Sequence, residues 1–164
     1  MLEIEIPNDE SYGNYIEFRY YATLVEICFT YTYGDPLENL MDRTASLLEG
    51  AEKGRLTFDS EPAIYPMNME RLDDTNLLIE IYWHPDEDDH PWEESERCVR
   101  LLRAVCPLID FAERVYGQMC ERFESMPRIS QECRFDTDYF PYGSFKALEK
   151  SLARAKALRS EFLR

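Results

Sequence analysis

Glycine is scarce in this sequence, and the motifs that depend on it are missing. The 164 residues contain six glycines and no G-x-x-x-x-G-K-[ST], G-x-G-x-x-G or G-x-S-x-G pattern. Loops that cradle phosphate groups, and the nucleophile turn of many hydrolases, are built on these patterns. The H-E-x-x-H zinc motif is also missing. No nucleotide-binding or hydrolase class can therefore be assigned from a motif.

Long apolar runs and paired cysteines are missing as well. No stretch approaches 18 uninterrupted apolar residues, so no membrane-spanning helix is predicted. The chain begins without the basic and apolar regions of a secretory signal. The five cysteines are odd in number and form no C-x-x-C pair, which argues against a disulfide framework or a zinc site. We therefore expect a cytoplasmic protein with no cofactor and no bound metal.

Positive charge is nearly absent from the first part of the chain. The formal net charge is -15, but residues 1–96 hold 24 acidic and five basic residues, a net of -19. Residues 97–164 hold nine acidic and thirteen basic residues, a net of +4. Such an acidic field repels nucleic acid and anionic membranes and attracts basic proteins. Two interpretations are open: the basic segment packs against the acidic one, or an acidic face stays available to a cationic partner.

The first part of the chain has the alternating pattern of β-strands. Residues 2–6 alternate apolar side chains with glutamates, and residues 15–33 are rich in β-branched and aromatic side chains. In this second stretch the parity of the apolar positions shifts near Tyr21. Because nineteen residues exceed a typical strand, we expect two strands, or one strand bent at a bulge.

A helix interrupts these strands. Asp35 followed by Pro36 is a strong helix start, because the carboxylate can cap the first free N–H groups and proline suits the first turn. The apolar stripe predicts a helix over about 36–52, ended by Gly54. Strands are then predicted at 55–59, 63–72 and 77–83, the last two as a hairpin, with Pro66 at a sheet edge or a bulge.

Apolar residues follow a helical spacing in the second part of the chain. From about Glu94 to Glu124 this spacing predicts one helix kinked at Pro107, or two abutting helices, and a further helix follows from Ser144 to about Phe162. The order of elements predicts an α+β fold. We expect a largely antiparallel sheet of about five to six strands, one helix inserted between strands, and two to three C-terminal helices on one face. The expected organisation is a single domain, 1–164, with an acidic strand-rich part (1–92) and a helical part (93–164).

The segment from His84 to Glu94 has an unusual composition. It contains both histidines, His84 and His90, together with six carboxylates and no base. Three interpretations are open. Histidine and carboxylate side chains suit a metal ion. An acidic segment with a tryptophan suits docking against lysines and arginines of a partner. The segment can also be a solvated loop that sets negative charge at the N-terminus of the next helix.

Tyrosines are concentrated in the acidic part, and bases in the last helix. Eight of the eleven tyrosines lie before residue 97. Strand periodicity favours a sheet surface with cross-strand aromatic pairs, and an interface patch is the alternative. For the bases of the last helix, neutralisation of the acidic part is favoured over contact with phosphates.

In size, charge and element order, the chain resembles the small acidic α+β immunity proteins and inhibitors with which bacteria neutralise basic toxin domains. The resemblance carries over no residue. It implies a binding protein that occludes a basic toxin or a nucleic-acid-acting partner, with acidic groups in the place of substrate phosphates. The alternatives are a metal-dependent enzyme that uses the loop between His84 and His90, and a structural subunit of a larger assembly. The expected partner-binding residues are Asp86, Glu87, Asp88, Asp89, Trp92, Glu93 and Glu94.

Overall fold

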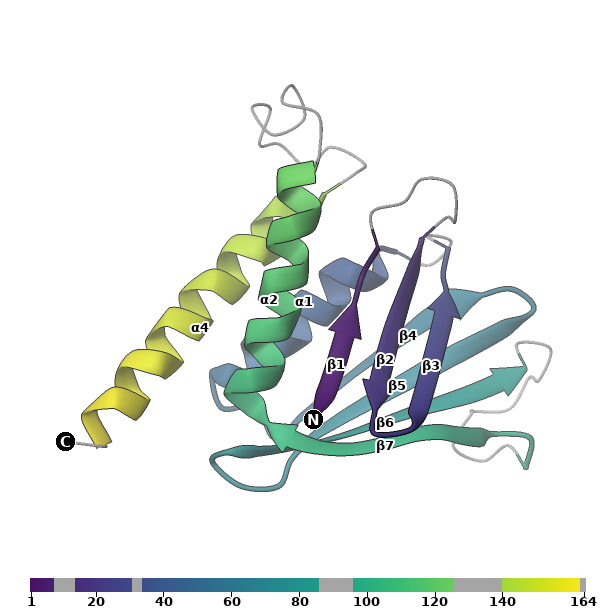
Figure 1. Cartoon of the computed structure of the whole chain (residues 1–164), viewed down its shortest axis with the longest axis horizontal. Coiled ribbons are helices and arrows are strands. Elements are labelled where there is room, and N and C mark those ends of the chain that lie inside the picture. Colours follow the sequence, from purple (N-terminus) through teal and green to yellow (C-terminus); the bar gives the residue numbers. More distant parts are fainter. Residues whose placement is uncertain (8–13, 31–33, 86–95, 126–139, 163–164) are drawn as a thin grey trace.

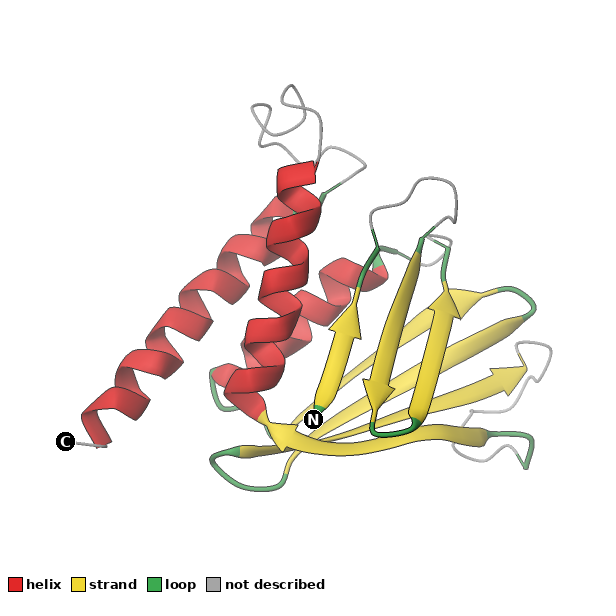
Figure 2. Cartoon of the chain, in the orientation of Figure 1, coloured by secondary structure: helices red, strands yellow, loops and turns green. Residues whose placement is uncertain are grey.

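The computed structural model contains two antiparallel sheets and three helices among the residues it describes, which are 1–7, 14–30, 34–85, 96–125 and 140–162 (Figure 1). The first sheet has the order β1-β2-β3, with β1 (Leu2–Glu5), β2 (Tyr15–Tyr20) and β3 (Thr23–Cys28). The second has the order β4-β5-β6-β7, with β4 (Lys53–Ser60), β5 (Ala63–Arg71), β6 (Asn76–Pro85) and β7 (Val99–Pro107). The helices are α1 (Pro36–Leu48), α2 (Leu108–Ser125) and α4 (Tyr142–Phe162), which lie together at one side of the sheets (Figure 2).

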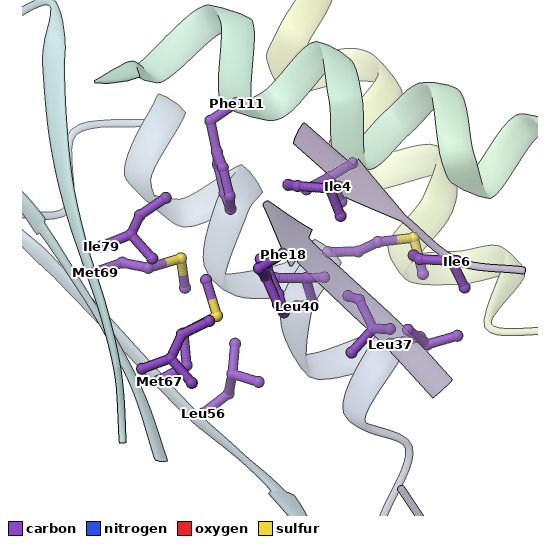
Figure 3. Packing of buried hydrophobic residues seen from close by; sticks show 14 of the residues in the cluster. Ile4, Ile6, Phe18, Leu37, Leu40, Leu56, Met67, Met69, Ile79 and Phe111 are labelled. Atoms are coloured by element: carbon purple, nitrogen blue, oxygen red, sulfur yellow. The ribbon is translucent and has the colours of Figure 1, made fainter. Parts of the chain in front are cut away.

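The two sheets share one apolar core. Buried residues from both sheets, from α1 and from α2 form a single cluster, and Figure 3 shows their side chains directed towards one another. The Phe58 ring of β4 contacts Phe18 of β2 and Phe29, with ring centroids 6.1 and 5.9 Å apart. Phe18 and Phe58 are 0% exposed, so these rings join the sheets where water is excluded. We therefore expect the two sheets to form one cooperative unit.

The start of α1 is the capped helix start that the sequence predicts. The Asp35 carboxylate accepts hydrogen bonds from the N–H groups of Leu37 and Glu38, at 2.8 and 3.3 Å. The end of the helix was predicted wrongly. It lies at Leu48, before Gly50, whose φ of 109° is a conformation that glycine adopts without strain. Gly54 belongs to β4 instead.

Aromatic rings hold α4 against α2. Phe145 of α4 stacks on Tyr116 and on Phe123 of α2, with ring centroids 5.1 and 6.0 Å apart. The Tyr116 hydroxyl also donates to Glu149 at 2.8 Å. These contacts fix α2, which in turn lies beside β1 (Figure 1). None of the described helices is both long and apolar enough to cross a membrane.

The α+β class and the antiparallel pairing are confirmed, but the prediction of one sheet was wrong. The seven described strands divide into sheets of three and four. Periodicity says which face of a strand is buried, and not which strands share hydrogen bonds. The break near Tyr21 is confirmed, since β2 and β3 pair as a hairpin around it.

Residues 99–107 form a strand where a helix was predicted. Leu102, Ala104 and Cys106 are buried, and Arg103 and Val105 between them are exposed. Short apolar runs can fit both strand and helix periods, so spacing alone did not separate the two. Because proline has no N–H to donate, Pro107 marks the boundary between β7 and α2 instead of a kink.

Pro66 was predicted at a sheet edge or a bulge, yet it lies in the central strand β5. It pairs with Thr57 of β4. On the β6 side, Ile64 stands opposite His84 and Met67 opposite Ile81, and the pairing is interrupted at Tyr65 and Pro66 between them. This gap in the ladder accommodates a residue that lacks an N–H group.

Candidate functional site

The outer face of the three-stranded sheet carries a concentration of acidic side chains. Side chains alternate between the two faces of each strand, so this face is made of the residues between the buried ones. It carries four carboxylates and one guanidinium, a formal net charge of -3. We call it the acidic face; its residues are Glu3, Glu5, Tyr15, Glu17, Arg19, Leu24, Glu26 and Cys28.

Three glutamates stand side by side across the acidic face. In the strand register, Glu5 of β1 is opposite Glu17 of β2, and Glu17 is opposite Glu26 of β3. Directly opposed residues have Cβ atoms about 4.5–5.5 Å apart, and like charges in that position destabilise a sheet. The folded chain therefore keeps three mutually repelling carboxylates in one row.

The surroundings of Glu17, the central residue of this row, shift the pKa of its carboxyl group. Burial raises the pKa of Glu17, and the charges of Glu5 and Glu26 raise it further. A hydrogen bond with the Glu26 carboxyl group acts in the same direction, whereas the Arg19 guanidinium lowers the pKa. Glu17 is thus held where its negative charge is poorly stabilised by the protein itself.

Arg19 gives the acidic face only partial compensation. Its guanidinium nitrogens lie 3.9 Å from a carboxylate oxygen of Glu3 and 3.9 Å from one of Glu17. Both distances are at the long end for an ion pair, and half of the Arg19 side chain is exposed to solvent. Pairs of this kind contribute about 0–1 kcal/mol. One such arginine cannot neutralise four carboxylates.

A groove runs along the edge of this face, between β1 and α2. Its volume is about 580 Å³, and its walls are Glu3, Ile4, Glu5, Ile6, Pro7, Gln118 and Glu121. The backbone N–H of Ile6 donates to the Gln118 Oε1 atom at 2.7 Å. Three carboxylates line the groove, so the acidic character of the face continues around the sheet edge.

A second, smaller hollow lies where the β2–β3 turn meets β7 and α2. Its volume is about 260 Å³, and Tyr20, Tyr21, Cys106 and Arg114 are among its lining residues. Tyr21 has a φ of 53°, which bulky residues rarely adopt, and it is 79% exposed. Burial, followed by the charge of Asp110, raises the pKa of Cys106 to about 11. The Cys106 thiol is therefore protonated at neutral pH and is a poor nucleophile.

None of the residues singled out in the sequence belongs to the acidic face as the structure describes it. Asp86, Glu87, Asp88, Asp89, His90, Trp92, Glu93 and Glu94 are outside the described residues. His84 is described: it belongs to β6, is 2% exposed and stands opposite Ile64 of β5. The prediction that a loop begins at His84 was therefore wrong. Across the described ranges, no group of three or more histidine, cysteine, aspartate and glutamate side chains is arranged to hold a metal ion.

The sequence contains a signal for the acidic face in the spacing of its glutamates. Glu3, Glu5, Glu17 and Glu26 all occupy the polar positions of predicted strands. Their meeting in rows depends on the register between strands, which a strand pattern does not specify. Comparisons of the chain with protein-family models, with curated proteins and with solved structures found no match.

Proposed function

We propose that this chain is an acidic binding protein that holds a basic partner protein against its acidic face. The row of Glu5, Glu17 and Glu26 carries the proposal. Lysine and arginine side chains of a partner would relieve the repulsion that the free protein maintains, and this relief would add to the binding free energy. The net charge of -15 would speed the encounter with such a partner.

The mechanism we propose is occlusion, as in an immunity protein or inhibitor of a basic toxin or nucleic-acid-acting enzyme. Carboxylates would occupy positions where that partner otherwise binds phosphates. Asp86, Glu87, Asp88, Asp89, Trp92, Glu93 and Glu94 remain the proposed second contact region, with the tryptophan as an apolar anchor. We place this function in the cytoplasm, where the thiols of the five cysteines would stay reduced.

The test compares two variants of equal charge. The first, Glu5→Gln/Glu17→Gln/Glu26→Gln, removes the row from the acidic face. The second, Asp42→Asn/Glu52→Gln/Glu61→Gln, removes three exposed carboxylates of α1, of the segment before β4 and of the β4–β5 turn. Each protein is used to capture partners from source cells at low salt, and the captured partner is purified and titrated by calorimetry.

The proposal expects a basic partner whose affinity falls at least tenfold for the first variant and less than threefold for the second. Binding must also weaken strongly in about 1 M salt, where the Debye length is about 3 Å. Equal losses for the two variants would show that only net charge matters and that the acidic face is not the binding site. Capture that is indifferent to salt, or capture of no basic protein, would contradict the proposed function itself.

A further inference from the structure

Strand β1 forms an edge of the three-stranded sheet. One side of β1 pairs with β2, and its other side faces α2 (Figure 1). Edge strands expose backbone N–H and C=O groups that can pair with another chain, and folded proteins usually cover or interrupt such edges. Here the covering is incomplete, because the groove of about 580 Å³ opens between β1 and α2.

A single side chain occupies one of the hydrogen-bonding positions of this edge. The Gln118 Oε1 atom accepts the N–H of Ile6 at 2.7 Å, as the carbonyl group of a neighbouring strand would. The Gln118 Nε2 atom donates to Glu121 at 3.2 Å, which orients the amide. Because N–H and C=O directions alternate along a strand, Ile4 presents its backbone groups to the same side as Ile6. The groove therefore runs along backbone groups that are aligned for strand pairing.

We propose that an extended segment of the partner, bearing lysine or arginine at alternate positions, binds in this groove as a fourth strand beside β1. Backbone hydrogen bonds would provide the affinity, and alternate side chains the specificity, as in other cases of strand addition. The choice of a basic segment follows from the charge of the groove, since Glu3, Glu5 and Glu121 line it. Side chains on the outer side of the added strand would lie directly beside Glu3 and Glu5.

This inference rests on the proposed function, because the added strand extends the acidic face. Opposite charges in directly opposed strand positions each contribute about 0.2–1 kcal/mol. A strand with alternate lysines would place these charges at the outer row while its other side chains face α2. The incoming backbone would compete with Gln118 for the N–H of Ile6 and would pair with Ile4.

The probe is a capped seven-residue peptide that alternates lysine with valine, tested on the full chain. Two isomers carry N-methyl groups, one on all lysine amides and the other on all valine amides. Since a strand pairs through alternate amides, methylation blocks only one edge of the peptide in each isomer. We expect one isomer to bind at least tenfold more weakly than the unmethylated peptide, and the other to bind within threefold of it.

Two further measurements locate the bound peptide. Amide hydrogen exchange followed by NMR should slow at Ile4 on binding. The variant Gln118→Lys places a cation in the groove and should abolish binding, whereas Ser125→Lys adds the same charge at the exposed end of α2 and should leave the affinity within threefold. Thermal unfolding shows whether both variants are folded, and the methylated isomers test the proposal on the unaltered protein.

Strand addition is overturned if both isomers bind as well as the unmethylated peptide, if exchange at Ile4 does not change, or if the unmethylated peptide does not bind. In these cases the proposed function can still stand, because its own test uses the intact partner and the glutamate variants. If that partner test fails while the peptide adds to β1 as described, the groove is a peptide site, and the acidic face is not the site of a basic protein.

Discussion

A glutamate on the outer face of each sheet has surroundings of opposite charge: Glu80 lies beside arginines, and Glu17 lies beside glutamates. Glu80 of β6 and Glu17 of β2 have nearly the same side-chain exposure, 19% and 16%. The Glu80 Oε1 atom lies 3.0 Å from an Arg100 nitrogen and 3.4 Å from one of Arg103, and the Tyr82 hydroxyl donates to its other oxygen at 3.1 Å. Glu17 has two glutamates as its directly opposed neighbours.

This difference separates a face that is neutralised within the chain from one that is not. The arginines beside Glu80 come from β7, in the basic segment of the sequence, so part of the charge asymmetry is compensated at the four-stranded sheet. The row on the three-stranded sheet has Arg19 alone as a close base among the described ion pairs. The basic segment thus compensates the acidic one at the four-stranded sheet, whereas the acidic face of the three-stranded sheet keeps most of its negative charge.

The largest expected change in unfolding free energy comes from the core that the two sheets share. Phe18→Ala removes a fully buried ring that contacts Phe58 across the sheets. Loss of such a ring costs about 3–5 kcal/mol of unfolding free energy. Urea unfolding should show this loss as a single transition by both fluorescence and circular dichroism. Two separate transitions would mean that the sheets unfold independently. Changes on their two faces could then not be compared through a single free energy of unfolding.

Glu80→Gln should destabilise the protein by about 1 kcal/mol at neutral pH. The substitution keeps the shape of the side chain but leaves Arg100 and Arg103 without their shared carboxylate. The arginines are more than half exposed, so solvent screens most of the attraction and the loss stays small. Urea unfolding at low salt measures it, and about 1 M salt should reduce it. No change at low salt would contradict the description of this face as internally compensated.

Glu17→Gln, in contrast to Glu80→Gln, should stabilise the protein. Removal of the central charge ends the repulsion with Glu5 and Glu26, and the contact with Arg19 at 3.9 Å is a smaller loss. Opposed like charges in a sheet suggest a gain of about 0.5 kcal/mol in unfolding free energy. The same unfolding measurement at low salt checks this gain. A destabilised variant would show that Arg19 outweighs both glutamates and that the row is not repulsive.

Several elements of the fold could be predicted because their causes are local. Asp35 and Pro36 start α1 through contacts within four residues. The change of parity near Tyr21 marks a two-residue turn between paired strands. By contrast, β7 was missed because its apolar residues fit two periods, and only its pairing with β6 makes it a strand.

The acidic face could not be predicted for a related reason. Each glutamate of the row is visible in the sequence as a polar position of a strand. Their repulsion depends on Glu5, Glu17 and Glu26 having the same register in three strands, and a slip of one residue would move a side chain to the core face. The sequence favoured the dense acidic run 86–94 instead, because proximity in sequence is visible without a fold, and that prediction stays untested.

The smallest expected effect is the pH dependence of the Glu17→Gln gain, and its sign follows from the raised pKa. Because its folded-state pKa lies above the ordinary value of 4.5, Glu17 binds its proton more tightly in the folded chain than in the unfolded chain. Its charge therefore costs stability above the folded-state pKa, and the cost disappears as the pH falls through that pKa to 4.5. The advantage of Glu17→Gln over the wild type should accordingly be present at pH 7 and absent near pH 4.

Glu149 is the control, because its pKa is shifted in the opposite direction: hydrogen bonds from Lys146 and then Tyr116 lower it. Glu149→Gln should destabilise at pH 7, and its penalty should fade as the pH falls below 4.5 through that lowered pKa. Urea unfolding of the three proteins at a series of pH values measures both differences. If the stability advantage of Glu17→Gln grew on acidification, the folded chain would stabilise Glu17 as an anion, and the row of glutamates would not be repulsive.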